Sequence, residues 1–313
     1  MKSIFALFAA AVLSATVAVA APAPQPCAVS GNDNAFLNIQ TIRLWAGDAP
    51  EAKGTTCDDV PTLTVVGPRK GAENGAAVIV LPGGAYAGLA GDLEGGEIAH
   101  WFAARGFRAF ILSYRLTSKG YVLPVPLYDA RRAVQLVRAH AVEYKIEPNK
   151  IAIIGFSAGG HLAALAGTQF VAGKPEAVDP VERVSSRPDY LILGYPWLGA
   201  ISSDTSHLSY CKIFNLMDKC EALRAAYTPA LFVSKETPPT FLYHTTTDKT
   251  VPVEQSLAFY EALVKNGVPA EMHIFANGGH GSGLGKGDAA LDQWPNLLES
   301  WLRAQGLFQT SAK

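Results

Sequence analysis

The chain of 313 residues lacks an excess of charge of either sign, with 26 Lys and Arg against 27 Asp and Glu. A near-neutral protein presents no broad basic surface to a phosphate backbone, so we expect no nucleic acid partner. Sequence repeats of fixed period are also missing, which excludes a solenoid. The hydrophobic content of 49% excludes an intrinsically disordered chain. These absences together predict a globular protein with a sizeable core.

Long apolar runs are missing after the first 20 residues. That opening stretch has Lys2, then an almost wholly apolar run over residues 4–19, and Ala18-Val19-Ala20 fits the small-x-small rule for cleavage. The run is too short for a membrane anchor, so we predict a signal peptide over residues 1–20 and a secreted or periplasmic protein. Residues 21–40 open with Ala-Pro-Ala-Pro-Gln-Pro, which predicts an N-terminal linker.

Cysteine is scarce, with only Cys27, Cys57, Cys211 and Cys220 in the chain. An even number in an oxidising compartment favours disulfides. Pairing Cys27 with Cys57 and Cys211 with Cys220 closes the shortest loops, and we favour it over the alternative of four free thiols. The cysteines form no Cys-x-x-Cys motif and have no clustered histidines beside them, so we predict no metal site.

Strand-like and helix-like segments alternate over residues 41–313, which we take as one catalytic domain. The strands are expected at 42–45, 62–66, 76–81, 108–114, 150–155, 190–194, 240–244 and 270–275, and the helices at 94–105, 127–144, 158–168, 253–266 and 291–305. This order predicts an α/β fold, with a mostly parallel central sheet and helices on both faces. Residues 196–237 interrupt the alternation and are expected to form a small insertion over the active-site edge.

The strongest chemical signal is Gly155-Phe156-Ser157-Ala158-Gly159. It lies between an apolar strand and a helix, which is the setting of a nucleophile elbow, and Ser157 is therefore the predicted nucleophile. The alternative is a glycine-rich turn with a helix-capping serine. The matching base is His280, which follows the last expected strand within a glycine-rich loop. The predicted acid is Asp248, four residues beyond the preceding strand, because triad members of this fold follow in the order Ser, acid, His.

The segment Leu81-Pro82-Gly83-Gly84-Ala85-Tyr86 follows the third expected strand, at the place of an oxyanion loop. We predict backbone N–H donors from Gly83, Gly84 and Ala158, and leave open which of the loop's N–H groups act. Tyr86 and Trp197 are candidates for lining the substrate site, with core packing as the equal alternative for each.

These segments resemble the α/β-hydrolase-fold esterases of the acetyl-xylan and carbohydrate esterase type, the BD-FAE-like or dienelactone-hydrolase-related group. The resemblance extends over residues 76–304 and implies Ser157, Asp248 and His280 as the catalytic triad. The chain departs from the pattern at Ala85, where relatives often have a third glycine, and at Ser282, where relatives commonly have an aromatic residue.

The resemblance implies a serine esterase that removes short acyl groups, acetyl above all, from carbohydrates such as xylan, without a metal or an organic cofactor. The partner is then a small-molecule, oligosaccharide or polysaccharide ester. One alternative is a serine peptidase of the prolyl-oligopeptidase-like type, which shares the fold and the triad order. The other is a non-catalytic binding protein on a hydrolase fold, which the presence of every part of the machinery disfavours.

Overall fold

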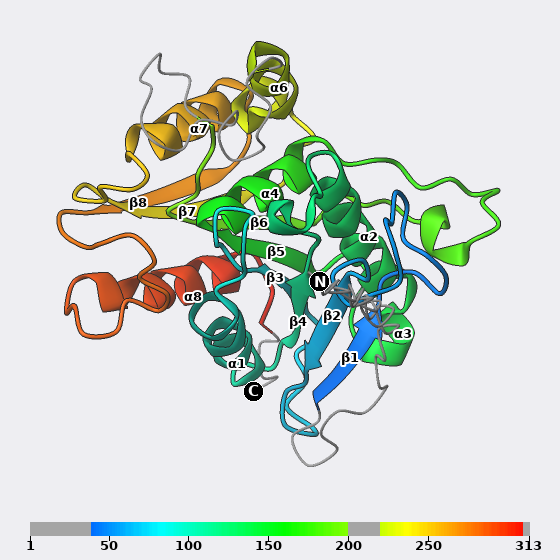
Figure 1. Cartoon of the computed structure of the whole chain (residues 1–313). Coiled ribbons are helices and arrows are strands. Elements are labelled where there is room, and N and C mark those ends of the chain that lie inside the picture. Colours follow the sequence, from blue (N-terminus) through cyan, green and yellow to red (C-terminus); the bar gives the residue numbers. More distant parts are fainter. Residues whose placement is uncertain (1–38, 200–219, 309–313) are drawn as a thin grey trace, which may run out of the picture.

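Eight strands form one sheet in the order β1-β2-β4-β3-β5-β6-β7-β8 (Figure 1). The computed structural model describes residues 39–199 and 220–308. β2 pairs antiparallel with both β1 and β4, and every other neighbouring pair is parallel, which confirms the expected mostly parallel sheet. The strands are Ile39–Arg43 (β1), Thr62–Val66 (β2), Ala77–Leu81 (β3), Arg108–Ser113 (β4), Ile151–Phe156 (β5), Tyr190–Gly194 (β6), Thr240–Thr245 (β7) and Ala270–Phe275 (β8).

Helices cover both faces of the sheet, with α2, α4 and α7 on one face and α1 and α8 on the other (Figure 1). The α-helices are Glu97–Ala103 (α1), Val125–Ala139 (α2), Ala141–Tyr144 (α3), Ser157–Thr168 (α4), Cys220–Tyr227 (α6), Glu254–Lys265 (α7) and Trp294–Ala304 (α8). Shorter helical turns are Gly91–Gly96 (η1), Thr117–Lys119 (η2), Pro180–Arg183 (η3), Pro229–Phe232 (η5) and Leu291–Gln293 (η6).

Strand β3 shows why the central strands are apolar at every position. Ile79 and Leu81 belong to the core under α2 and α4, while Val78 and Val80 belong to the core under α1 and α8. Successive side chains of a strand point to opposite faces, so a sheet covered on both sides leaves no position for a polar residue. All five residues of β3 are buried.

Three expected helices differ in detail from the prediction. The segment 291–305 begins as the turn η6 and continues as α8. The segment 127–144 is two helices, because the backbone at His140 (φ −100°, ψ 22°) leaves helical geometry and separates α2 from α3. The segment 94–105 starts earlier than expected, as the π-helical turn η1, and continues as α1. α1 ends before Gly106, whose φ of 90° suits a residue without a Cβ.

Several predicted features fall wholly or partly outside the described residues. These are the signal peptide, most of the linker over 21–40, and residues 200–219 of the expected insertion, together with Cys27 and Cys211. Cys57 is not a free thiol, but its pairing and that of Cys220 stay predictions. Among the helices that the structure describes, none has the length and apolar character needed to cross a membrane.

Candidate active site

Ser157 lies at the sharp turn between β5 and α4. Its φ of 51° is a strained value for a residue with a side chain, as a nucleophile elbow requires. A Cβ at Gly155 would lie 2.2 Å from the carbonyl oxygen of Gly159, and a Cβ at Gly159 would lie 2.1 Å from that of Leu81. The two flanking glycines are therefore required by the close approach of backbone to backbone.

The structure brings the Ser157 hydroxyl, the His280 imidazole and the Asp248 carboxylate into one hydrogen-bonded chain. His280 Nδ1 lies 2.7 Å from Asp248 Oδ2, and His280 Nε2 lies 2.7 Å from Ser157 Oγ. Because β5, β7 and β8 run parallel, the loops that follow them meet at one edge of the sheet. A carboxylate accepts, so Nδ1 carries the hydrogen and Nε2 accepts from the serine. The arrangement can move a proton from the hydroxyl to the ring.

Asp248 is held as a carboxylate by donors on both of its oxygens. Burial alone would raise the pKa of Asp248, but hydrogen bonds from His244, from His280 and from the N–H of Val251 hold it well below its ordinary value. Oδ1 accepts from the backbone N–H groups of Thr250 and Val251 at 2.8 and 2.9 Å. Asp248 therefore closes its own loop, and α7 has no side-chain cap.

His244 is a residue whose contribution the sequence did not reveal. Its Nε2 lies 3.0 Å from the carbonyl oxygen of Val251 and 3.4 Å from Asp248 Oδ2, and its Nδ1 lies 2.8 Å from the Ser256 hydroxyl. A carbonyl oxygen only accepts, so the ring hydrogen is on Nε2 and faces the carboxylate. The ring is fully buried and lies beside the same carboxylate oxygen, Oδ2, that His280 contacts.

Gly83 does not have the role predicted for it. Its backbone N–H donates to Glu94 Oε2 at 2.7 Å, so it is already committed and cannot serve as an oxyanion donor. Gly84 and Ala85 are the next residues of the loop, and both line a cavity with Ser157 and Ala158. Ala158 is in the first turn of α4, where helix N–H groups have no intrahelical partner. The loop residues that can face a developing oxyanion are therefore Gly84 and Ala85, opposite Ala158.

The cavity beside Ser157 has a volume of about 250 Å³, and its other lining residues include Ala90, Glu94, Trp197 and Thr250. Trp197 is among the residues that line this cavity, and its side chain is also part of the buried core. Tyr86 is not among the lining residues, because its fully buried ring packs against Tyr114 and His161. Of the two alternatives left open for Tyr86, core packing is the one that the structure shows, and the residue does not line the cavity.

His161 is fully buried one turn beyond Ser157 and belongs to the core. Its Nε2 lies 2.8 Å from the carbonyl oxygen of Tyr227, so Nε2 carries the hydrogen and Nδ1 accepts from the Tyr86 hydroxyl at 2.7 Å. Burial lowers the pKa of His161 to about 4. This neutral ring links the oxyanion loop to the end of α6.

Glu94 and Tyr195 form a second buried connection that sequence patterns did not indicate. Glu94 Oε1 accepts from the Tyr195 hydroxyl at 2.7 Å, while Oε2 accepts from Gly83. The Tyr195 oxygen also accepts from the N–H of Gly283 at 3.1 Å, and its ring lies edge-on to His280 with centroids 5.1 Å apart. The pair therefore ties the oxyanion loop to the loop that carries His280. The sequence gives no signal for it, because Glu94 is one of three acidic residues at this helix start, with Asp92 and Glu97.

Backbone strain collects around this site. Ala85, Tyr86, Ser157 and Tyr195 are four of the six non-glycine residues with positive φ in the described ranges. No group of three or more side chains suited to holding a metal ion occurs in the same ranges.

A mostly parallel sheet with a serine elbow, followed along the chain by an aspartate loop and a histidine loop at one edge, defines the α/β-hydrolase fold.

Comparisons with known proteins agree with this class and narrow it. The BD-FAE family profile matches residues 63–182, and the profile of the prolyl oligopeptidase family matches residues 199–305. The solved structure of an acetyl ester-xyloside bifunctional hydrolase from Caldicellulosiruptor lactoaceticus superposes with a TM-score of 0.77 at 38% identity, over 86% of this chain and 97% of that one. The chain belongs to the α/β-hydrolase-fold esterases of the acetylxylan and carbohydrate esterase type.

Two curated relatives are similar in sequence. Endo-1,4-beta-xylanase B of Butyrivibrio fibrisolvens is 33% identical over 209 residues, covering 65% of this chain and 32% of the relative. An acetylxylan esterase of Xylanibacter ruminicola is 31% identical over 235 residues, covering 74% of this chain and 46% of the relative. The chain thus spans a third to a half of the length of these relatives.

Proposed function

We propose that this protein is a secreted serine esterase that removes acetyl groups from carbohydrates, with acetylated xylan as the substrate class. The observation that carries the proposal is the hydrogen-bonded chain of Ser157, His280 and Asp248, with 2.7 Å at each contact, at the edge of a small cavity. The names of the relatives, an acetylxylan esterase and an acetyl ester-xyloside hydrolase, support the choice of substrate.

The geometry supports a two-step acyl transfer. Ser157 Oγ attacks the ester carbonyl carbon as its proton passes to His280 Nε2, and the carbonyl oxygen becomes an oxyanion facing the N–H groups of Ala158 and the Gly84-Ala85 segment. Asp248 stabilises the imidazolium that forms. The C–O bond to the sugar breaks and the sugar oxygen takes the proton from His280. Water then repeats the sequence on the acyl-enzyme, releasing acetate and restoring Ser157.

The size and lining of the cavity favour a short acyl group. Its walls near Ser157 come from Gly84, Ala85, Ala90 and Ala158, and Trp197 limits its extent. Each further methylene of an acyl chain gains about 0.8 kcal/mol only where an apolar wall receives it. The cavity of about 250 Å³ must also hold part of the alcohol, so little apolar surface is left to contact a longer acyl chain.

We propose export on the basis of Lys2, the apolar run over residues 4–19 and the Ala18-Val19-Ala20 site. Export also provides the oxidising compartment in which Cys27–Cys57 and Cys211–Cys220 would form. N-terminal sequencing of protein from the culture fluid or periplasm tests this proposal, with Ala21 as the expected first residue. A mature protein that still starts at Met1 would contradict it.

A peptidase is the second candidate, because the prolyl oligopeptidase profile matches residues 199–305. A peptidase of that type needs a carboxylate free to bind a substrate amine. Among the described residues, Glu94 is the carboxylate that lines the cavity, and its two oxygens already accept hydrogen bonds from Gly83 and Tyr195. This occupancy favours the esterase over the peptidase.

The test is acetate release from acetylated xylo-oligosaccharides, with an aminoacyl anilide as the peptidase substrate. We expect turnover of the first and none of the second. Ser157→Ala should lower kcat by about 10⁴ to 10⁶, whereas Ser300→Ala, at an exposed serine of α8, should leave it unchanged. Cleavage of the anilide, or retention of more than about a tenth of the activity in Ser157→Ala, would overturn the proposal.

A further inference from the structure

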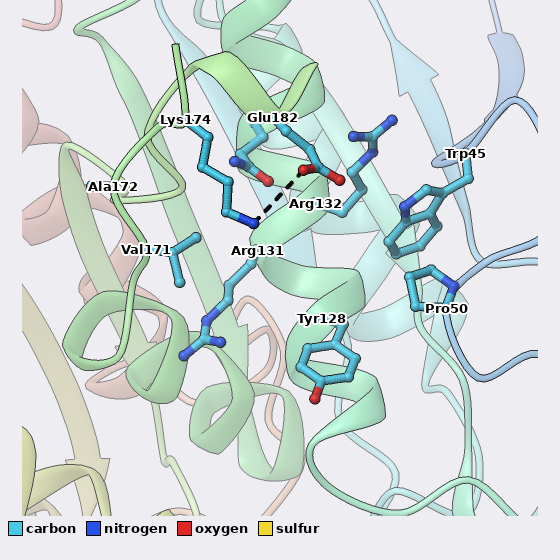
Figure 2. Close-up of a pocket in the computed structure, with 10 residues that line it drawn as sticks. Trp45, Pro50, Tyr128, Arg131, Arg132, Val171, Ala172, Lys174 and Glu182 are labelled. Atoms are coloured by element: carbon cyan, nitrogen blue, oxygen red, sulfur yellow. Dashed lines mark ion pairs between the residues drawn. The ribbon is translucent and has the colours of Figure 1, made fainter. Parts of the chain in front are cut away.

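A second cavity of about 280 Å³ lies between α2, the segment after β1, and the chain that follows α4 (Figure 2). None of its lining residues lines the cavity beside Ser157. In Figure 2, Lys174 and Arg131 lie on one side of the open space and Trp45 and Pro50 on the other, with Tyr128 below. The esterase mechanism uses none of these side chains.

The wall on α2 is built by helical spacing. Tyr128, Arg131, Arg132 and Gln135 follow at i, i+3, i+4 and i+7, so they share one face of the helix. That face places two arginines beside an aromatic ring. Trp45 closes the opposite side, and the guanidinium carbon of Arg132 lies 5.5 Å from the centre of its ring. The indole is therefore held in place by a neighbouring cation.

Among the described residues around this cavity, two of the three cationic side chains have a carboxylate partner and the third has none. Arg132 pairs with Asp179 at 2.6 Å, and Lys174 lies 3.9 Å from Glu182. Arg131 donates to the carbonyl oxygen of Gln169, but within the described chain it has no carboxylate partner and its Nε has no hydrogen-bond partner. A partly buried cation without a counter-ion is costly. Among the described residues, no carboxylate neutralises the charge of Arg131.

We propose that this cavity binds a sugar that carries one carboxylate, that is, a uronic acid residue of a carbohydrate chain. A single carboxylate would neutralise Arg131, which has no carboxylate partner among the described residues, and the guanidinium can hold it through two parallel N–H donors. The rings of Trp45 and Tyr128 offer flat apolar faces for the C–H faces of a pyranose. The choice of a sugar as the carrier rests on the proposed function, whereas the demand for an anion rests on Arg131 alone.

Such a site would hold an acidic side group of a polysaccharide while the ester is hydrolysed at Ser157. Its effect should then depend on the substrate. Removing the charge at position 131 should raise KM for an acidic acetylated xylan, with kcat unchanged, because the residue does not line the cavity beside Ser157. The same change should leave both constants for p-nitrophenyl acetate unaltered, since that ester has no carboxylate.

The decisive experiment is calorimetric binding to the full-length Ser157→Ala protein, which cannot turn substrate over. The probes are a xylo-oligosaccharide bearing one glucuronic acid, a neutral xylo-oligosaccharide of equal length, and inorganic phosphate. We expect the acidic sugar to bind about tenfold more tightly than the neutral one. Arg131→Met, which keeps the apolar stem, should remove that difference, and Arg131→Lys, which keeps the charge, should retain part of it. Arg183→Met is the matched control, because Arg183 is a nearby arginine that does not line the cavity.

Equal binding of the two sugars, or unchanged binding in a folded Arg131→Met protein, would overturn the proposal. Phosphate binding as tight as that of the acidic sugar would reduce the cavity to a general anion site and would also overturn it. The binding assay does not depend on ester hydrolysis. Failure of the esterase proposal would therefore appear as missing acetate release, and failure of this one as missing binding.

Discussion

Tyr195→Phe is the substitution that best tests whether the Glu94–Tyr195 pair positions the catalytic loops. The change removes one oxygen atom and keeps the ring beside His280. It deletes the 2.7 Å hydrogen bond to Glu94 Oε1 and leaves the N–H of Gly283 without its acceptor at 3.1 Å. Glu94 and Gly283 are both buried, and Gly283 does not line the cavity beside Ser157, so water does not readily replace the acceptor that its N–H loses.

The magnitude follows from these two losses. A hydrogen bond to a charged group contributes about 1.5 to 3 kcal/mol, and a buried N–H left without a partner adds about 1 kcal/mol or more. We expect the free energy of unfolding to fall by about 3 kcal/mol. If a third to a half of that energy, about 1.4 kcal/mol, holds the loops in the geometry that stabilises the transition state, kcat should fall about tenfold. KM for p-nitrophenyl acetate should change little, because the hydrogen bonds that are lost join the two catalytic loops and are not contacts with this small substrate.

The matched control is Tyr121→Phe. Tyr121 is also buried and donates to a carboxylate, that of Asp59, but neither residue lines the cavity beside Ser157. Urea unfolding and p-nitrophenyl acetate kinetics of both variants separate the two effects. We expect both to lose stability and only Tyr195→Phe to lose kcat. Equal kcat values in Tyr195→Phe and wild type, beside a clear loss of stability, would refute the positioning role.

Three further outcomes are expected. On p-nitrophenyl esters, kcat/KM should be highest for acetate or propionate and at least about tenfold lower for octanoate, because the walls near Ser157 are short; an octanoate optimum would point to a lipase. Asp248→Asn should lower kcat by about 10⁴ while the protein stays folded, since the amide no longer holds His280 in the productive tautomer; a loss below about tenfold would contradict this role. The pKa of about 4 for buried His161 lies below the ordinary value of 6.5, so the folded state binds fewer protons than the unfolded state between those values. Stability should therefore fall by up to about 3 kcal/mol as pH drops from 6.5 to 4, and His161→Gln should flatten the urea-midpoint profile over that window; an unchanged slope would exclude His161 as its source.

The sequence by itself determined the fold and the order of the catalytic segments. The continuous apolar runs such as Ala77–Leu81 predict a doubly covered parallel sheet, because only a strand buried on both faces has no polar position. The glycines at 155 and 159 predict the elbow, because close backbone contact excludes a Cβ. The order of Ser157, Asp248 and His280 also carries information, since parallel strands bring their following loops to one edge.

Only the tertiary structure decided which polar atoms meet. Glu94 and Tyr195 are 101 positions apart in the chain. The sequence does not distinguish Gly83 from Gly84 as an oxyanion donor, whereas in the structure the Gly83 N–H donates to the Glu94 carboxylate. Tyr86 is an aromatic residue at the end of the oxyanion loop, which is typical of a substrate site, but its ring is buried against His161. Local patterns fix strands, helices and turns because those depend on neighbours in the chain. Side-chain hydrogen bonds between distant segments depend on packing, which no short pattern encodes.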